Sequence, residues 1–434
     1  MENRYDKYKD SGIAWIGEIP EHWEVCSIKQ IMKNKSIKGF PNETVLSLYR
    51  DFGIIPKDSR DDNHNVTSED TSNYKLVENG DFVINKMKAW QGSMAISDFK
   101  GIISPAYYIC KIFSPKVVRK YIHYLLRDES YKAEYMRLST GMRIGQWDLN
   151  IDDFLQINTI LPLLSEQQSI ATYLDQKCGE IDELITMQEE MITKLQSYKQ
   201  SVITEAVTKG LDKNVPLKDS GIEWIGKIPE HWKVKRLKFS CNVFGRIGFR
   251  GYKSDDLVSE GNGAITLSPS NMKDMKMDYT NRTYLSWKKY YESPEIMISK
   301  NDILMVKTGS TYGKCSFVDD IPMECTINPQ IVVFKQHKDY PKFLAYSFQT
   351  KATRAFVETS VVGGTIPTIA QEKIMNYFFA FPPLSEQQSI ANYLDQKCSE
   401  IDELISIKQQ KIEKLKDYKK SLIFECVTGK RKVS

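Results

Sequence analysis

The segment NKMKAWQGS at residues 85–93 brings two lysines, two amides and a tryptophan together within nine positions, directly after a strand-like run. Arginine and lysine can donate hydrogen bonds to the edge of guanine, and asparagine and glutamine can bond the edge of adenine. Cations that contact phosphates add affinity for a nucleic acid. A second polar loop, STGMRIGQW at residues 139–147, is interrupted by glycines. The candidate binding residues of this half of the chain are Lys86, Lys88, Trp90, Gln91, Ser93, Arg143 and Gln146, with Tyr49 and Arg50 as weaker candidates.

The second half of the chain carries polar loops at corresponding places. KTGSTYGK (307–314) follows another strand-like run, GGT (363–365) corresponds to the second loop, and GRIGFRG (245–251) holds two arginines. Lys86 and Lys307 align, which favours a shared phosphate anchor, because base-reading residues should differ between the halves. For any single residue, a solvated loop is the alternative. The candidates here are Arg246, Arg250, Lys307, Thr308, Ser310, Thr311, Tyr312, Lys314 and Thr365.

The sequence argues against catalysis by this chain alone. GSTYGKC (309–315) resembles a phosphate-binding P-loop but is one residue short, and Cys315 replaces the Ser or Thr that would hold magnesium. We find no NPPF- or NPPY-type methyltransferase tetrapeptide, no glycine-rich methyl-donor loop, no PD…ExK set and no HExxH. The His-Trp pairs at 22–23 and 231–232 recur identically beside proline, which favours a structural or docking turn.

The composition is that of an ordinary globular protein. With 434 residues, 41% of them hydrophobic and 27% charged, the chain should form two or three domains. A net charge of +4 permits nucleic-acid binding without requiring it, because phosphate contacts depend on where cations cluster. The chain shows neither a membrane-spanning run nor a signal peptide, so we expect a cytoplasmic protein. Its eight cysteines form no CxxC motif, which favours buried free thiols over zinc.

Two segments occur twice, almost unchanged. LSEQQSIATYLDQKCGEIDELI (164–185) returns at 384–405 with 20 of 22 positions identical. DSGIAWIGEIPEHWEV (10–25) returns at 219–234 with 13 of 16 identical. The sequences between these segments are largely unlike each other. Near-identical repeated segments around dissimilar intervening sequences suit a protein that recognises two different ligands with one symmetric scaffold.

Each copy of the longer repeat opens a long helix. A capping-box pattern marks the start, with Ser165 as N-cap and Gln168 three residues on, and C′ glycines mark the ends at Gly210 and Gly429. Each helix would run about 44 residues, or roughly 66 Å. Alternating spacings of four and three define a narrow apolar seam, typical of a two-helix coiled coil. The simplest partner for each helix is the other; the alternative is two separate helices or packing on other proteins. The seam positions are Leu174, Cys178, Ile181, Ile185, Gln188, Ile192, Leu195, Lys199, Val202 and Ala206, and then Leu394, Cys398, Ile401, Ile405, Lys408, Ile412, Leu415, Lys419, Leu422 and Cys426.

The sequences between the repeats predict two mixed α/β globules. The match of GDFVINK (80–86) with NDILMVK (301–307) and the shared order of elements indicate diverged copies of one domain. A pseudo-twofold relation would make the helices antiparallel and bring the N-terminal motif beside the end of the second helix, in a circular arrangement. The expected strands are 44–49, 81–84, 107–113, 264–267, 303–306 and 331–334, and the expected shorter helices are 117–138 and 340–356.

The expected fold class is therefore α/β (α+β), with two globular domains joined by two long antiparallel coiled-coil helices. The expected segments are a first globule at 1–163 containing the motif 10–25, a spacer helix at 164–210, a second globule at 211–383 containing the motif 219–234, a second spacer helix at 384–429 and a basic tail at 430–434.

The LSEQQ…EIDELI and WIG…IPEHW segments resemble the conserved regions of DNA-specificity (S) subunits of type I restriction–modification systems. SLYRDFG (47–53), NKMKAWQGS (85–93) and GIISPAYYI (101–109) resemble recurrent elements of one class of target recognition domain in that family. VKTGSTYGK (306–314) and INPQI (327–331) resemble another class. The resemblance covers nearly the whole chain.

The resemblance implies a division of labour. Each globule would be a target recognition domain that reads one half of an asymmetric split site in double-stranded DNA. The paired helices would act as a ruler, with half-site centres at most about two duplex turns apart, and as the docking surface for two modification (methyltransferase) subunits. Restriction (motor-nuclease) subunits would complete the complex, which methylates adenine and cleaves DNA. No cofactor is expected on this chain; S-adenosylmethionine and ATP with Mg would bind the partner subunits.

Two other classes of protein remain as alternatives. One is a non-enzymatic scaffold whose globules bind protein and whose helices oligomerise, which sequence-selective duplex binding would exclude. The other is an enzyme with its active site in a globule, which methyl transfer by the purified chain alone would support.

Overall fold

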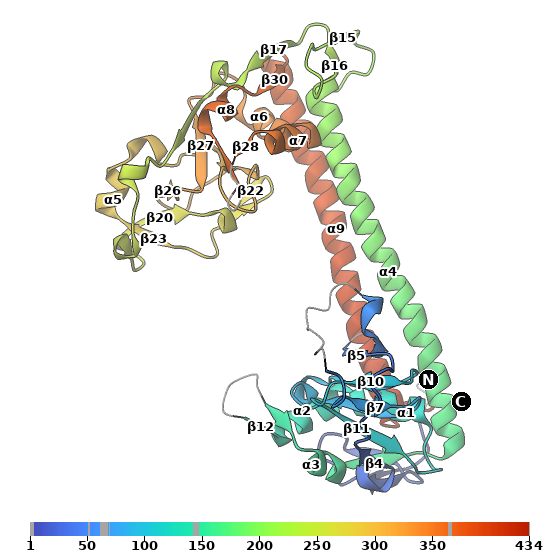
Figure 1. The fold of residues 1–434 in the computed structure, drawn as a ribbon. Coiled ribbons are helices and arrows are strands. Elements are labelled where there is room, and N and C mark those ends of the chain that lie inside the picture. The colour runs from blue at the N-terminus through green and yellow to red at the C-terminus, as the bar shows by residue number, and fades with distance from the viewer. Residues whose placement is uncertain are drawn as a thin grey trace. The chain divides into compact units, whose positions relative to one another are not determined.

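The computed structural model describes residues 4–50, 53–60, 68, 70–141, 147–362 and 367–433. The chain forms two compact units, one of residues 1–189 with 409–434 and the other of residues 190–408. Each unit combines one globule with part of each long helix, α4 (Leu164–Lys209) and α9 (Leu384–Val427), drawn in green and red in Figure 1. The predicted fold class, two mixed α/β globules with two paired long helices, is confirmed.

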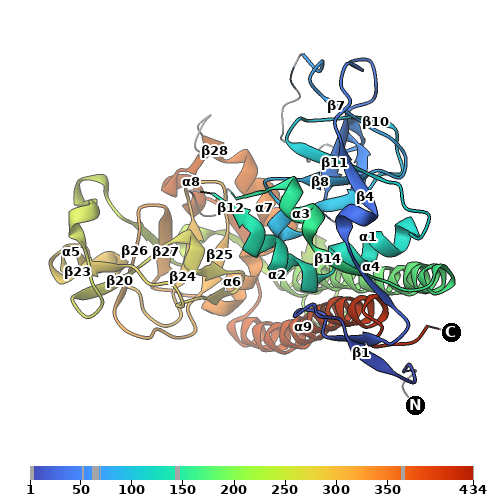
Figure 2. The same ribbon diagram turned by 90° about the horizontal axis from the view of Figure 1, so that it is seen from below.

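The first globule is built on an antiparallel sheet with the strand order β4-β11-β8-β9, of which β4, β11 and β8 are labelled in Figure 2. Along β8, Phe82 and Ile84 enter one hydrophobic cluster and Val83 enters another, because successive side chains of a strand point to opposite faces. Helices α1 (Arg119–Arg127) and α2 (Glu129–Leu138) contribute to the first cluster. The strands are β4 (Met32–Lys35), β11 (Tyr107–Ile112), β8 (Phe82–Asn85) and β9 (Met94–Ile96).

Short elements complete the first globule. Residues of the β5–β6 and β7–β10 pairs join Val83 in the second cluster, so they cover the other face of the sheet. The remaining elements are β1 (Tyr8–Asp10), β2 (Glu18–Pro20), β3 (Glu24–Ser27), β5 (Leu46–Tyr49), β6 (Gly53–Pro56), β7 (Lys75–Val77), β10 (Gly101–Ile103), β12 (Ser139–Thr140), β13 (Asp148–Leu149), α3 (Ile151–Gln156) and β14 (Asn158–Leu161).

Residues 117–138 form two helices, so the prediction of a single helix was wrong. Asp128, between α1 and α2, has an extended backbone with φ −61° and ψ 148°. Its carboxylate accepts a hydrogen bond from the backbone N–H of Ser130 at 2.9 Å and caps the start of α2. A capping residue within an apolar-periodic run can therefore end one helix and begin the next.

The same correction applies to residues 340–356 of the second globule. They divide into α6 (Pro341–Phe348) and α7 (Lys351–Thr359). The hydroxyl of Thr350 accepts a hydrogen bond from the backbone N–H of Thr353 at 3.2 Å and caps α7. The cap lies at the corresponding place in both globules, although one is a carboxylate and the other a hydroxyl.

The second globule repeats the central sheet with the order β18-β27-β24-β25. The turns before the equivalent strands β8 and β24 are also alike. The carboxylate of Asp81 accepts a hydrogen bond from the backbone N–H of Glu78 at 2.7 Å, and that of Asp302 accepts one from the backbone N–H of Ser299 at 2.8 Å. On the face that holds Leu304, however, lies a second four-stranded sheet, β19-β23-β20-β26, with β20 and β26 parallel. The two globules therefore share their central sheet and differ in the layer that covers it.

The six predicted strands are all present, with bounds within two residues of the expected ones. The elements of the second globule are β15 (Leu217–Asp219), β16 (Lys227–Pro229), β17 (Lys233–Arg236), β18 (Asn242–Gly245), β19 (Leu257–Val258), β20 (Gly263–Leu267), β21 (Met272–Lys273), β22 (Lys276–Met277), β23 (Tyr284–Ser286), α5 (Trp287–Tyr291), β24 (Ile303–Val306), β25 (Cys315–Phe317), β26 (Cys325–Ile327), β27 (Ile331–Lys335), β28 (Val361–Val362), β29 (Thr368–Ile369), α8 (Gln371–Met375) and β30 (Phe378–Phe381).

Helices α4 and α9 pair along the predicted seam and run antiparallel. In the first unit, Lys419 Nζ of α9 lies 2.7 Å from Asp182 Oδ1 of α4. In the second unit, Lys199 Nζ of α4 lies 2.6 Å from Asp402 Oδ1 of α9. Every seam position is buried or half-buried, so the coiled-coil prediction is confirmed. Two of the lysines within the seam, Lys199 and Lys419, thus each reach a carboxylate on the other helix.

The predicted capping box at the start of α4 was wrong. The helix begins at Leu164, so Ser165 lies inside its first turn. The carboxylate of Glu166, not Gln168, reaches back and accepts a hydrogen bond from the backbone N–H of Leu163 at 3.3 Å. The predicted glycine ends hold, because Gly210 and Gly429 both have a left-handed backbone, with φ of 75° and 73°.

In the first unit, the N-terminal segment and α1 contact the residues where α9 ends and α4 begins. His22 Nε2 lies 2.9 Å from Glu166 Oε2 in the first turn of α4. The Tyr8 hydroxyl donates to the carbonyl of Gly429 at 3.1 Å, and the Tyr121 hydroxyl donates to the carbonyl of Val427 at 2.9 Å. The start of the chain thus meets the end of the second helix, which confirms the circular arrangement.

In the second unit, the repeated motif holds the junction of α4 and α9 in the same way. His231 Nε2 lies 2.8 Å from Glu386 Oε2, and Trp232 Nε1 donates to Glu386 Oε1 at 3.1 Å. A Cβ built on Gly210 would lie 3.4 Å from the ring of Trp232. The His-Trp pairs therefore have the structural place that the sequence indicates.

All eight cysteines are free thiols, seven of them buried and Cys26 half-buried. Among the residues described, no group of His, Cys, Asp and Glu side chains is arranged to hold a metal ion. Within the same ranges, no helix has the length and apolar character needed to cross a membrane.

We predict that Gly429→Ala destabilises the protein more than Gly210→Ala. Both changes place a side chain on a left-handed backbone, which costs about 1–2 kcal/mol. At Gly429 the new Cβ would also lie 2.4 Å from Pro20 Cδ, and such overpacking costs about 1–3 kcal/mol more. Urea unfolding followed by circular dichroism measures both. Gly179→Ala is the control, because this helical glycine has open space around it and should gain up to about 1 kcal/mol. Equal losses at Gly429 and Gly210 would contradict the predicted contact with Pro20.

Candidate nucleic-acid interface

The first polar loop of the first globule is a tight turn that follows β8. The backbone N–H groups of Lys88 and Gln91 donate to the carbonyls of Asn85 and Lys88, both at 3.0 Å, and Gly92 closes the turn with φ of 76°. Because the backbone groups bond within the turn, its side chains remain to make contacts with a ligand. Lys88 is exposed, Lys86, Trp90 and Gln91 are half-buried, and Ser93 is buried beneath the turn.

The hairpin β12–β13 brings the second polar loop against the first. The backbone N–H of Leu149 donates to the carbonyl of Lys86 at 3.1 Å. The rings of Trp147 and Trp90 meet edge to face with centroids 5.2 Å apart. Lys86 Nζ also lies 3.3 Å from Asp148 Oδ2. The described end of the second predicted loop, at Trp147, thus lies beside the first loop; Arg143 and Gln146 lie outside the described residues.

A third segment, the turn between β5 and β6, joins this group through Arg50. Arg50 Nη2 donates to Gln91 Oε1 at 2.6 Å. The guanidinium of Arg127 in α1 donates to the Arg50 carbonyl. The sequence marked Tyr49 and Arg50 only as weaker candidates, because nothing local shows that this turn reaches Gln91.

Lys75 of β7 is a neighbouring cation that sequence reasoning missed. Its ammonium group donates to the carbonyl of Tyr107 at 2.6 Å and lies 5.6 Å from the ring centroid of Tyr108. Burial lowers the pKa of Lys75 first, and the nearby charges of Lys38 and Lys86 lower it further. Three lysines therefore share one region, and only tertiary pairing brings them together.

In the second globule, the 307–314 loop follows β24 in the same way. The backbone N–H groups of Tyr312, Gly313 and Lys314 donate to carbonyls within the loop or its strand, at 3.1, 2.7 and 3.2 Å. These donors are unavailable to a phosphate, which adds to the case against a P-loop. Ser310 and Thr311 are exposed, and Thr308, Tyr312 and Lys314 are half-buried.

Lys86 and Lys307 occupy equivalent backbone positions. Their N–H groups donate to the carbonyls of Ala106 at 3.3 Å and Gln330 at 2.8 Å. Their carbonyls accept from Leu149 at 3.1 Å and Ile369 at 2.8 Å, each in the last strand of the second hairpin. The alignment of these lysines is thus reproduced in three dimensions. Thr365 lies outside the described residues.

The side chains of the two lysines have different surroundings. Lys86 pairs with Asp148, whereas no acidic side chain in the described ranges pairs with Lys307. Burial lowers the pKa of the Lys307 ammonium group. Lys307 is therefore the cation with more to gain from an incoming phosphate.

The two arginines of GRIGFRG bind within their own globule. Arg246 is only 5% exposed; its Nε donates to the carbonyl of Ile327 and its Nη2 to the hydroxyl of Thr326, both at 3.1 Å. Burial lowers the pKa of its guanidinium group. Arg250 Nη1 lies 3.3 Å from Glu295 Oε1. Arg246 thus holds its loop to β26, a role that the sequence did not indicate.

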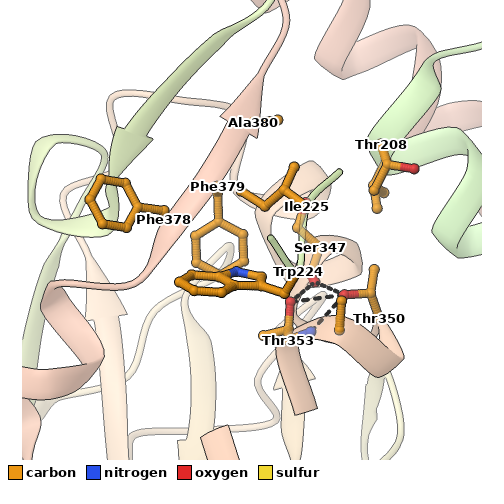
Figure 3. A pocket seen from close by; sticks show the side chains of 11 residues that line it. Thr208, Trp224, Ile225, Ser347, Thr350, Thr353, Phe378, Phe379 and Ala380 are labelled. Carbon is orange, nitrogen blue, oxygen red and sulfur yellow. Dashed lines mark hydrogen bonds between the residues drawn. The ribbon is translucent and has the colours of Figure 1, made fainter. Parts of the chain in front are cut away.

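Two cavities adjoin these elements in the second unit. One of about 340 Å³, between the 307–314 loop and α7, is lined by the cations Lys314 and Arg354 and the acids Asp274 and Glu358. Figure 3 shows the other, of about 30 Å³, where Trp224 and Ile225 of the repeated motif meet Ser347, Thr350 and Thr353. The Thr353 hydroxyl donates to the Ser347 carbonyl at 2.9 Å. With room for about one water molecule, this second cavity is a packed joint rather than a ligand site.

Comparison with known sequences identifies the class of these globules. The profile of the type I restriction modification DNA specificity domain matches residues 20–194 and 229–417. The type I restriction enzyme MjaVIII specificity subunit of Methanocaldococcus jannaschii is 25% identical over 427 residues, which cover 96% of this chain and 94% of that protein. The putative MjaX specificity subunit of the same organism is 25% identical over 435 residues, with 96% of each chain covered.

Two solved structures share the fold. One, from work on complex assembly and conformational transition of the type I R-M system, has a TM-score of 0.71 at 16% identity and covers 94% of this chain and 98% of that chain. The HsdS subunit from Thermoanaerobacter tengcongensis has a TM-score of 0.53 at 16% identity, covering 95% and 98%.

Two copies of one α/β scaffold, each with its own polar loops and both joined to a pair of long helices, define a two-part recognition protein. Since the matched profile spans most of the chain, this chain belongs to the family of type I restriction–modification DNA-specificity (S) subunits. It is the DNA-specificity subunit of such a system and not its catalytic part.

We predict that Lys307→Ala lowers the affinity for all duplex sequences alike and flattens the dependence of log K on log salt by about one unit. Lys86→Ala should flatten it less, because Asp148 already offsets that charge. Fluorescence anisotropy titrations at several salt concentrations measure both slopes. Lys300→Ala is the control, since this exposed lysine precedes β24 whereas Lys307 follows it. An unchanged slope for Lys307→Ala would refute the phosphate contact.

Proposed function

We propose that each globule reads one half of an asymmetric, bipartite site in double-stranded DNA. The observation that carries this proposal is the repeat itself. The central sheets have the same strand order, and the backbones of Lys86 and Lys307 fix the second hairpin to the first loop in the same way. The side chains on the loops nevertheless differ, NKMKAWQGS in one and KTGSTYGK in the other. Both globules therefore present their loops in the same way but with different side chains, as the recognition of two different half-sites requires.

The chemistry of the loops supports base and phosphate contacts together. Their backbone groups are bonded internally, so recognition falls to side chains such as Lys88, Gln91, Ser310 and Thr311. Amides and hydroxyls can bond the edges of bases in the major groove. Lysines can neutralise phosphates, a contact that positions the protein without reading sequence. Arg246 enters this proposal as a residue that orients its loop.

We further propose that the paired helices carry two modification subunits, which methylate adenine, and that restriction subunits can join them. Exposed apolar side chains recur on the outer faces of both helices at the repeat offset, Leu184 with Leu404 and Tyr198 with Tyr418. Solvent-facing apolar groups repeated in this way suit two copies of one partner. S-adenosylmethionine and ATP with Mg belong to those partners. The complex would act in the cytoplasm, where its DNA is.

We predict that co-expression with the cognate modification subunit yields one methylated motif. In a host without other methylation, sequencing that detects N6-methyladenine should show a gapped, asymmetric site methylated on both strands. The modification subunit expressed alone is the control and should give no motif. A soluble complex that methylates nothing would contradict the proposal and favour a protein-binding scaffold.

A further inference from the structure

The Arg50–Gln91 pair has a geometry that bears on which base the first globule reads. Arg50 lies in the turn between β5 and β6, and Gln91 lies in the turn after β8. Arg50 Nη2 donates to Gln91 Oε1 at 2.6 Å, and the Arg50 carbonyl accepts from the guanidinium of Arg127. The arginine is therefore held both by its backbone and by its side chain, although it is exposed.

The hydrogen bond decides what Gln91 can offer a base. A glutamine reads adenine with two groups, its oxygen accepting from N6–H and its amide N–H donating to N7. In this structure the oxygen already accepts from Arg50. What the pair presents is therefore mainly a set of donors, the remaining N–H groups of the guanidinium fork and the amide N–H₂, beside the one lone pair left on the amide oxygen. In the major groove guanine offers two acceptors, N7 and O6, to such a set.

We infer that Arg50, oriented by Gln91, reads a guanine in the half-site of the first globule. This inference rests on the proposed function and adds the base and the residue. Arginine bonded to O6 and N7 of guanine is the chemistry for which a fixed, planar fork is suited. Sequence position alone would assign Gln91 to adenine; the bond to Arg50 reverses that assignment.

The second globule has a different residue at this position, as a base-reading site requires. Tyr312 stands where Gln91 stands, at the offset that aligns Lys86 with Lys307, and it packs against the core cluster of its unit. In place of the β5–β6 and β7–β10 pairs, a four-stranded sheet covers the corresponding face. The inferred contact therefore concerns one half-site only, and the other half-site serves as an internal reference.

The test compares methylated motifs for the complex with the modification subunit. The wild-type chain should give a motif with a guanine at a fixed position of one half. Arg50→Ala should reduce the preference for that guanine by roughly 10- to 100-fold and leave the other half unchanged. Gln91→Ala should reduce it less, because the arginine remains but loses its orientation. Arg119→Ala is the matched control: this arginine lies over Gly80, ahead of β8, whereas the turn with Gln91 follows β8.

Three outcomes would overturn the inference. An unchanged motif for Arg50→Ala would show that this residue reads no base. A uniform loss of affinity at all sequences, with the motif intact, would assign Arg50 to a phosphate. If Arg50→Ala instead lost the preference for an adenine, the assignment of guanine to Arg50 would be wrong. Arg50→Lys provides a second variant that keeps the charge, and it should keep part of the guanine preference. Failure of the proposed function is separate, since the wild-type chain would then give no gapped motif.

Discussion

The hydrophobic core of each globule is completed by the two long helices, and the rest of the structure depends on this shared burial. In the first unit, Leu174 of α4 and Leu422 of α9 lie in one cluster with Phe82 of the sheet. In the second, Val202 and Leu394 lie in one cluster with residues of β24 and β27. Burying one such side chain stabilises by about 1.5–3 kcal/mol, so neither the seam nor a globule reaches its full stability alone. The near-identity of the repeated segments follows, because each must fit a helix pair and a sheet at once.

Because this burial stabilises the scaffold, the recognition loops of the two globules can differ in sequence. Each recognition loop begins where a central strand leaves the sheet, and its backbone polar groups bond to one another or to the second hairpin. The conformation is therefore maintained by backbone hydrogen bonds and by glycines such as Gly92, with φ of 76°. Side chains on such a turn can change with little cost to the fold. The same scaffold can present an amide in one globule and a tyrosine in the other.

Charge is organised locally, which explains why a net charge of only +4 suffices for a DNA-binding protein. Lys199 and Lys419 of the helix seam are each paired with an aspartate, and Arg246 is bonded to a carbonyl and a hydroxyl inside its globule. These cations serve the fold. Lys88 and Arg50, which are exposed, and Lys307, which has no acidic partner among the described residues, lie on or beside the polar loops. A count of basic residues would not separate the two groups; their partners do.

The sequence by itself determined the features that arise from local pattern. These are the duplicated segments, the antiparallel helix pair, its glycine ends, two strands of each central sheet and the polar loop that follows one of those strands in each globule. Tertiary structure decided the rest. Asp128 and Thr350 split two predicted helices because their side chains cap a new turn, and Glu166 rather than Gln168 reaches back at the start of α4. Burial of Arg246, the grouping of Lys75 with Lys86, and the bond from Arg50 to Gln91 join segments far apart in the chain. Periodicity and capping act over a few residues and can be read along the chain, whereas side-chain partners depend on which strands and turns the fold brings together.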